Sequence, residues 1–203
     1  MRLATYNVNS IRARMPRVLE WLEEAQPDVV ALQETKVEDD KFPVAEIEAA
    51  GYHVAFHGQQ KYNGVAFLSK VTAEDFVAGY APGFSEDCRV VRAVFDGVMF
   101  INTYVPNGTV VGGDKWAYKM AWLEQFNGFV SGLASPGDKV LWLGDINIAP
   151  TAADVYDHER LLGEVGHHPD EFSRLQNIVD WGWTDVFRLQ GDDPGHYTFW
   201  DFR

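Results

Sequence analysis

The sequence predicts a layered α/β fold, and three observations carry this prediction. Segments typical of strands and of helices alternate along the 203 residues, with no repeat and no low-complexity linker between them. The composition is that of a globular protein, with 46% hydrophobic and 14% aromatic residues. The length is that of one domain with a sizeable core. We therefore expect a single α/β domain over residues 1–203.

The N-terminal part of the chain predicts two strands and two helices. Residues 3–8 are a short β-prone run, and residues 28–32 are a continuous apolar run of the kind that forms a buried strand. Between them, Pro16 stands early in a helical stretch. Its apolar positions recur at helical spacing: Val18, Leu19, Leu22 and Ala25. A further short helix follows Pro43 and ends at Gly51, a residue suited to a C-terminal cap.

The middle of the chain has the pattern of strands. Residues 65–68 form one short apolar run. Residues 89–95 and 98–104 form two more runs, separated only by Asp96 and Gly97. Because Asp-Gly between two strands is a strong signal for a two-residue turn, these runs are expected to pair as a β-hairpin.

The last third of the chain returns to alternation. Residues 116–133 are predicted to be helical, residues 140–143 to be a buried strand, and residues 171–181 to be a second helix. The closing residues, 198–203, have strand-like character.

The charge balance is strongly acidic. The chain carries 17 Lys and Arg against 30 Asp and Glu, a formal net charge of −13. This argues against a protein held on nucleic acid by bulk positive charge, although it is compatible with a local basic patch. The residues available for such a patch are Arg12, Arg14, Lys36, Lys61, Lys115 and Lys119. For any one of them alone, ordinary surface charge is the favoured interpretation.

Three further features concern the compartment. Cys88 is the single cysteine, which excludes an internal disulfide and a cysteine-rich zinc site. No apolar run reaches the roughly 18 residues that a membrane span needs. The first strand-like segment begins next to Met1, which leaves no room for a signal peptide. The expected location is therefore the cytoplasm.

Polar residues that could take part in catalysis or ligand binding stand at the ends of four predicted strands. Asn7 and Asn9 stand at the end of the first strand, and residues 33–36 (QETK) follow the second. Residues 104–108 (YVPNG) follow the hairpin, and residues 144–147 (GDIN) follow the strand near residue 140. Because ligands of layered α/β folds bind in the crevice at strand ends, these four termini predict one site.

Each of these residues also has an interpretation that needs no function. Asn7 suits a turn or a cap, Glu34 suits a solvated surface, and Tyr104 suits a packed ring with a satisfied hydroxyl. Asp145 after Gly144 suits a turn. The joint pattern favours chemistry, because two carboxylates and two amides are hard oxygen donors that suit Mg²⁺ or Mn²⁺ rather than zinc. Such an ion usually acts on phosphate.

Six segments together resemble the exonuclease III family of DNA-repair nucleases and AP endonucleases, a branch of the endonuclease/exonuclease/phosphatase superfamily. In chain order they are TYNVNSIRAR, DVVALQETK, TYVPNG, LWLGDINIAP, GWTDVFR and YTFWDFR. The LQETK and GDINIAP types recur across the superfamily and indicate a metal-dependent phosphoesterase. YVPNG and YTFWDFR are more specific to the DNA-repair branch.

The resemblance implies a four-layer α/β sandwich of two mixed β-sheets flanked by helices. It also implies an enzyme with Mg²⁺ as cofactor, Mn²⁺ being possible, and double-stranded DNA with abasic sites or blocked 3′ ends as substrate. The reactions implied are incision 5′ to abasic sites and 3′→5′ exonuclease activity, in base excision repair.

The same resemblance assigns roles to residues. Asn7 and Glu34 look like metal-site residues, with Glu34 as the principal Mg²⁺ ligand, and Asp145 and Asn147 are placed at the metal as well. Tyr104 is similar to the active-site tyrosine that binds the scissile phosphate, Asp145 to the general acid or base, and Asn147 to a phosphate-orienting residue.

Three residues are assigned to substrate binding by the same resemblance. Asn107 belongs to the YVPNG segment, and Phe199 and Trp200 stand where relatives place an aromatic wall against the abasic sugar. Such a wall is physically reasonable, because a sugar without its base exposes apolar surface.

Family members continue beyond the segment that ends at Arg203, adding an IDHIL-like strand and an SDHxP-like motif. That motif supplies an aspartate and a histidine to the active site, and none of the six histidines here stands in such a context. We therefore expect a C-terminally incomplete domain that lacks its last strands. Loss of a positioned acid or base typically lowers a rate by about 10²–10⁴.

Three functions stay open at this point. The favoured one is a Mg²⁺-dependent DNA-repair phosphodiesterase. The second is a superfamily relative that hydrolyses a small phosphoester, against which the YVPNG and YTFWDFR segments count. The third is a truncated, weakly active or inactive relative that binds DNA or a partner.

Overall fold

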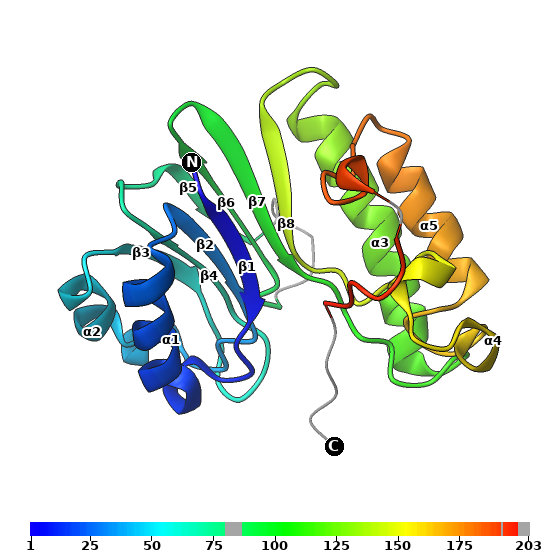
Figure 1. Ribbon diagram of the computed structural model, residues 1–203, viewed down its shortest axis with the longest axis horizontal. Helices are drawn as coiled ribbons and strands as arrows, with labels where there is room; N and C mark the ends of the chain where they lie inside the picture. The colour runs from blue at the N-terminus through cyan, green and yellow to red at the C-terminus, as the bar shows by residue number, and fades with distance from the viewer. Residues whose placement is uncertain (80–86, 192, 199–203) are drawn as a thin grey trace. The chain divides into compact units, whose positions relative to one another are not determined.

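The computed structural model describes residues 1–79, 87–191 and 193–198. The chain divides into two compact units (Figure 1). The first comprises Met1–Val105 and Lys139–Ile146, and the second comprises Pro106–Asp138 and Asn147–Arg203. The single domain expected from the length stays a prediction, and each unit is described by itself.

The first unit contains two mixed sheets of four strands each. One sheet has the order β1-β2-β4-β3 and the other has the order β5-β6-β7-β8. The strands of the first sheet are β1 (Leu3–Asn7), β2 (Val29–Gln33), β3 (His53–His57) and β4 (Val65–Ser69). Those of the second are β5 (Glu74–Ala78), β6 (Val90–Phe95), β7 (Val98–Tyr104) and β8 (Val140–Asp145). The predicted α/β class with mixed sheets flanked by helices is confirmed.

Alternation along the central strands divides the first unit into two cores. In β2, Val30 and Leu32 point to one face and pack with helix α1 (Ile11–Ala25) and helix α2 (Val44–Ala49) (Figure 1). Val29 and Ala31 point to the other face and pack against the second sheet. Because both faces of β2 are buried, its sequence is a continuous apolar run rather than an alternating one.

The β6–β7 hairpin has the register that the Asp-Gly turn predicts. Asp96 and Gly97 both have positive φ, at 50° and 73°, and Phe95 pairs with Val98 across the turn. A two-residue turn of this kind matches the right-handed twist of the strands that it joins.

Several boundaries differ from the prediction: the helix expected at residues 116–133 begins at Asp114, and the helix expected at residues 171–181 covers Pro169–Val179. Helix α1 begins at Ile11, ahead of Pro16, because the Ser10 side chain accepts a hydrogen bond from the Ala13 amide and caps the helix there. Strand β8 continues to Asp145, since parallel pairing with β7 extends as far as Tyr104.

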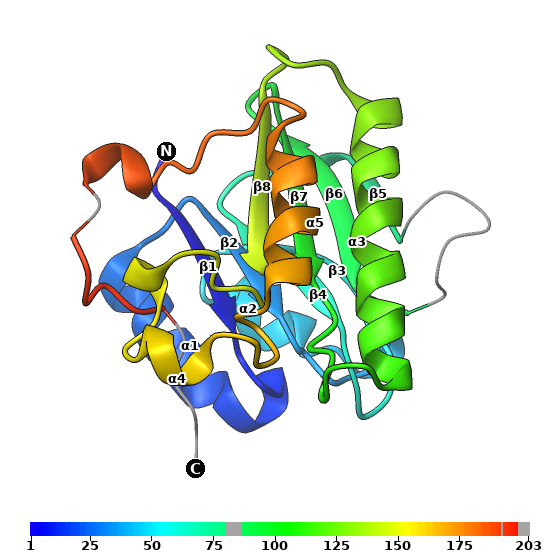
Figure 2. The same cartoon turned by 90° about the vertical axis from the view of Figure 1, so that its right-hand side faces the viewer.

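The second unit is built from two long helices and short turns. Helix α3 (Asp114–Leu133) and helix α5 (Pro169–Val179) lie side by side (Figure 2). The described residues of this unit also form helix α4 (His158–Leu161) and 3₁₀ turns at Ala152–Asp154 and Arg188–Gln190. A third 3₁₀ turn, Asp39–Lys41, belongs to the first unit. No helix in the described ranges is long and apolar enough to cross a membrane.

Candidate active site

Each sheet contains one parallel pair of strands, and the candidate residues stand at the ends of these two pairs. Asn7 ends β1 opposite Gln33 of β2, and Tyr104 ends β7 opposite Asp145 of β8. Parallel strands end at the same edge of a sheet, so each pair delivers two chain segments to one place. Residue Glu34 follows Gln33 directly.

One amide joins the two carboxylates of this region. The Asn7 Nδ2 group donates to Glu34 Oε1 at 2.8 Å and to Asp145 Oδ2 at 2.8 Å. The Asn7 Oδ1 atom accepts a hydrogen bond from the Asn9 amide at 3.0 Å, which orients the side chain. We call Asn7, Glu34, Tyr104 and Asp145 the carboxylate–amide cluster. All four are half-buried.

The backbone beyond β1 and β2 directs Glu34 toward Asn7. Parallel pairing continues past the strands, with the Val8 amide donating to Gln33 O at 3.0 Å and the Ser10 amide to Glu34 O at 2.8 Å. Glu34 itself has a φ of 53°, in the left-handed region that costs energy for a side chain other than glycine. Such strain is typical of residues held in place at functional sites.

The Glu34 carboxylate is held in its ionised form. Burial raises its pKa, but hydrogen bonds from Asn7, Lys36 and Tyr104 outweigh burial and bring the pKa below its ordinary value. The ion pair between Lys36 Nζ and Glu34 Oε2 spans 2.7 Å. Glu34 therefore carries a full negative charge at neutral pH.

The Tyr104 hydroxyl is held in its neutral form. Burial raises the pKa of Tyr104 strongly, and the charge of Glu34 and the hydrogen bond between the two side chains raise it further. The Arg89 guanidinium lies over the Tyr104 ring, 4.8 Å from its centroid, and donates to Tyr104 O at 3.2 Å. Tyr104 is thus a fixed hydrogen-bond donor at neutral pH.

A glycine allows β8 to reach β7 just before Asp145. A Cβ atom on Gly144 would lie 2.1 Å from the Thr103 carbonyl oxygen, and Gly144 has a φ of 146°. Only glycine fits this approach, so the residue before Asp145 is dictated by the strand pairing.

The second unit holds the other two candidate amides. Asn107 Nδ2 donates to Asn147 Oδ1 at 3.3 Å. We call these two residues the asparagine pair. Asn107 follows Tyr104 by three residues and Asn147 follows Asp145 by two, so short spans of chain link the pair to the cluster.

The comparisons with known proteins bear on the whole chain. Residues 4–203 match the model of the endonuclease/exonuclease/phosphatase family. The chain belongs to this family. It is 31% identical to exodeoxyribonuclease III of Haemophilus influenzae over 100% of this chain and 81% of that protein.

Solved structures give the same result for the fold. An AP endonuclease from Archaeoglobus fulgidus is 37% identical, with a TM-score of 0.96 over 100% of this chain and 79% of that one. The 3′ phosphatase NExo from Neisseria, bound to a product DNA hairpin, is 36% identical with a TM-score of 0.94 over the same shares. The fold is therefore the α/β sandwich of the family, and the chain is a phosphodiester hydrolase of the exodeoxyribonuclease III and AP endonuclease type.

The family is one of divalent-metal-dependent nucleases, and the donors of the carboxylate–amide cluster fit such an ion. Two carboxylates converge on the Asn7 amide, and magnesium sites typically use one or two carboxylates and complete the shell with water and phosphate oxygens. Within the described ranges, no three His, Cys, Asp or Glu side chains form a metal-sized group, so a dedicated zinc-type cage is lacking there. Glu34 and Asp145 would hold the ion.

The predicted roles of these residues stay predictions, although their positions are now known. The structure brings Asn7, Glu34, Tyr104 and Asp145 together in one unit, and it pairs Asn107 with Asn147 in the other. Phe199 and Trp200 lie outside the described residues. Lys119 does not belong to a surface patch, because its side chain is 0% exposed.

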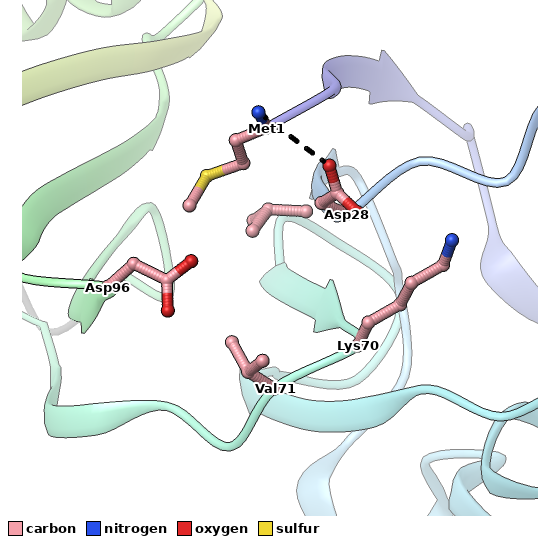
Figure 3. A pocket seen from close by; sticks show the side chains of 6 residues that line it. Met1, Asp28, Lys70, Val71 and Asp96 are labelled. Atoms are coloured by element: carbon pink, nitrogen blue, oxygen red, sulfur yellow. Dashed lines mark ion pairs between the residues drawn. The ribbon is translucent and has the colours of Figure 1, made fainter.

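A shallow hollow at the other end of the strands is unrelated to this chemistry. It is lined by Met1, Asp28, Val29, Lys70, Val71 and Asp96 (Figure 3). Asp28 precedes β2, whereas Glu34 follows it, so the whole length of the strand separates the hollow from the cluster. Its closest charge pair joins the Met1 amino group and Asp28 at 4.0 Å.

Sequence reasoning missed Arg89, although the sequence contains a signal for it. The two-residue turn at Asp96 and Gly97 sets the register of the hairpin, and counting outward from that turn places Arg89 opposite Tyr104. An arginine opposite a candidate tyrosine is a reason to expect a stacked pair.

Proposed function

We propose that this chain is a Mg²⁺-dependent DNA-repair phosphodiesterase that incises DNA 5′ to abasic sites and removes nucleotides or blocking groups from 3′ ends. Base excision repair is the process in which such a reaction is used. The observation that carries the proposal is the sharing of the Asn7 amide by Glu34 and Asp145, within a chain of the nuclease family.

The chain's own groups supply the positioning and the proton transfer. A bound divalent ion offsets the charge of the phosphate that is attacked. The neutral Tyr104 hydroxyl, which donates to Glu34 in the free protein, turns its one proton to a phosphate oxygen when substrate binds. The asparagine pair of the second unit offers further amide donors of the kind that bind phosphate. Asp145, oriented by Asn7, takes a proton from the water that forms the new P–O bond and returns it to the 3′ oxygen as the old P–O bond breaks.

The names of the relatives support a DNA substrate. One relative is an exodeoxyribonuclease, one is an AP endonuclease and one was solved with a product DNA hairpin. The description of NExo as a 3′ phosphatase favours removal of a 3′ phosphate as a second reaction at the same site.

The decisive assay uses two labelled duplexes, one with a single abasic analogue and one with a 3′ phosphate. Each is incubated with Mg²⁺, with Mn²⁺ and with EDTA. We expect metal-dependent incision 5′ to the lesion, reduced by at least about 10²-fold in Glu34→Gln, because an amide cannot replace the charge at the ion.

Glu20→Gln is the matched control, since Glu20 is an exposed carboxylate that pairs with Arg17 on the surface of α1. It should cleave like the wild type. Equal activity of Glu34→Gln and wild type would reveal a contaminating nuclease and contradict the proposal, as would the absence of any metal-dependent cleavage.

A further inference from the structure

A buried ion pair in the second unit is attached to both members of the asparagine pair. Lys119 of α3 and Glu171 of α5 have side chains that are 0% exposed, and Lys119 Nζ is hydrogen-bonded to Glu171 Oε1. Lys119 Nζ also donates to Asn107 O at 3.1 Å and to Asn147 O at 2.7 Å. An ammonium group has three donors, so these contacts account for all of them.

Glu171 fixes the other side of the same arrangement. Its Oε2 atom accepts from the Gly166 amide at 2.8 Å and from the His168 amide at 3.1 Å. The Ala149 amide in turn donates to Gly166 O at 2.7 Å. The segment that carries Asn147 is therefore tied to Glu171 by a second route, independent of Lys119.

Packing around the ammonium leaves little room for adjustment. A Cβ atom on Gly108, next to Asn107, would lie 3.2 Å from Lys119 Cδ and 3.4 Å from the Trp116 ring. Gly108 has a φ of 96°, which suits glycine. The turn that follows Asn107 therefore packs directly against the aliphatic part of the Lys119 side chain.

We propose that Lys119 is a positioning residue, whose buried ammonium joins the Asn107 and Asn147 carbonyls at one point and thereby sets the two side-chain amides for the substrate phosphate. This inference rests on the proposed function. Lys119 does not contact DNA itself, because it is fully buried and its donors are used inside the protein. Glu171 supplies the charge that keeps the ammonium stable there.

The test separates positioning from stability with a double variant, Lys119→Met/Glu171→Gln. It removes both buried charges while keeping an oxygen for the Gly166 and His168 amides, so the loss of stability from an unpaired buried charge is avoided. We expect a Tm within a few degrees of the wild type. We also expect kcat/KM on the abasic duplex to fall by about 10- to 100-fold, because the two amides are no longer held.

A second readout does not depend on DNA cleavage. The side-chain amide NMR signals of Asn107 and Asn147, assigned with Asn107→Ala and Asn147→Ala, should move or broaden in the double variant. If the wild type does not cleave DNA, the proposed function fails, and these signals still decide whether Lys119 positions the pair.

The matched control is Glu124→Gln/Arg174→Met. It removes an ion pair of 3.1 Å that joins the same two helices but is partly exposed. This control should keep the wild-type amide signals and activity within about twofold, since exposed pairs contribute little.

Two results would overturn the inference. One is a folded Lys119→Met/Glu171→Gln variant with unchanged amide signals or undiminished kcat/KM. If that variant does not fold, Lys119→Arg is measured instead, because it keeps a positive charge opposite Glu171 but replaces the compact ammonium with a larger, planar group. Displaced Asn107 and Asn147 amide signals in Lys119→Arg support the role of Lys119, and wild-type signals overturn it.

Discussion

Burial chiefly keeps Tyr104 neutral and hydrogen bonds keep Glu34 ionised, and one contact between the two side chains adds to both effects. Tyr104 and Glu34 share a hydrogen bond that raises the pKa of the tyrosine and lowers that of the glutamate. The pair therefore offers a neutral donor and a full negative charge side by side at neutral pH. A phosphate and a divalent ion need this combination at one site.

Removing the tyrosine hydroxyl tests this coupling. In Tyr104→Phe we expect kcat to fall by about 10²-fold, the typical loss for one donor to a developing oxyanion. Glu34 also loses a group that lowers its pKa, so the acid limb of the pH–rate profile should move to higher pH. A profile measured from acid to neutral pH checks both points, and an unmoved acid limb would contradict the coupling.

The depressed pKa of Glu34 also predicts a pH dependence of stability. A carboxyl whose pKa is lower in the folded state contributes stability above its unfolded pKa, and this contribution is lost as the pH falls through the folded pKa. The free energy of unfolding of the wild type should therefore decrease as the pH falls below 4.5, the ordinary pKa of glutamate. The decrease should be smaller in Glu34→Gln. Urea titrations at several pH values measure this difference. Parallel curves for the two proteins would show that Glu34 makes no such contribution.

At the scale of elements, strand pairing determines which residues the turns can accept. The β6–β7 turn needs positive φ at Asp96 and Gly97, and the end of β8 needs a residue without Cβ at Gly144. Both demands come from the backbone rather than from side-chain packing, since Gly97 has nothing within 4 Å of its Cβ position. The position of Asp145 in the site therefore depends on the close backbone approach of Gly144 to Thr103.

A series of alanine substitutions checks this interpretation. Gly97→Ala should lower the free energy of unfolding by about 1 kcal/mol, the cost of a left-handed conformation for alanine. Gly144→Ala should cost more and also lower activity, because the Thr103 carbonyl must move away from a Cβ at 2.1 Å. Gly128→Ala, inside α3 with open space around it, should stabilise by about 0.5–1 kcal/mol. Denaturant unfolding of the three variants gives the order, and a different order would contradict it.

At the scale of the whole molecule, the proposed DNA substrate has to be bound by a strongly acidic chain. The net charge is −13, and Lys36 and Lys119 are engaged with Glu34 and Glu171. Arg12, Lys61 and Lys115 are exposed and remain available to phosphates. Few phosphate contacts imply weak binding that depends only moderately on salt.

This gives a measurable slope. With about two to three phosphate contacts, affinity for a duplex should fall by about 10- to 40-fold between 50 and 200 mM salt, against 10³–10⁵ for six to ten contacts. Fluorescence anisotropy of a labelled duplex, with Ca²⁺ replacing Mg²⁺ to prevent cleavage, measures it. A slope in the steeper range would mean that far more basic groups reach the DNA.

Much of the fold was predictable from local pattern, whereas the pairing of distant groups was not. The Asp96–Gly97 turn, the buried β2 run and the helix after Pro43 each follow from a short stretch of sequence. Residue type alone places Lys119 among the candidates for a basic surface patch, with ordinary surface charge as the favoured interpretation. Its spacing from Trp116 and Leu123 places it on the buried face of α3, a helical signal that residue type alone conceals.

The candidate site divides in the same way. Sequence predicted that Asn7, Glu34, Tyr104 and Asp145 lie at strand ends, because each follows an apolar run. It could not predict that one amide serves both carboxylates, or that Glu171 pairs with Lys119 from 52 residues away. Contacts of that kind depend on how sheets and helices pack, which local periodicity does not encode.

The shared Asn7 amide has a consequence for how the protein acquires activity during folding. Its two hydrogen bonds join residues 27 and 138 positions apart, one partner directly after β2 of the first sheet and the other at the end of β8 in the second. Contacts of such different range form late, since the longer loop must close before the second bond exists. A partly folded chain in which only the N-terminal sheet has formed therefore has Glu34 in place but lacks Asp145, the second carboxylate of the cluster. Recovery of nuclease activity on refolding then reports completion of the two-sheet core. A chain whose two sheets have not packed together is therefore inactive.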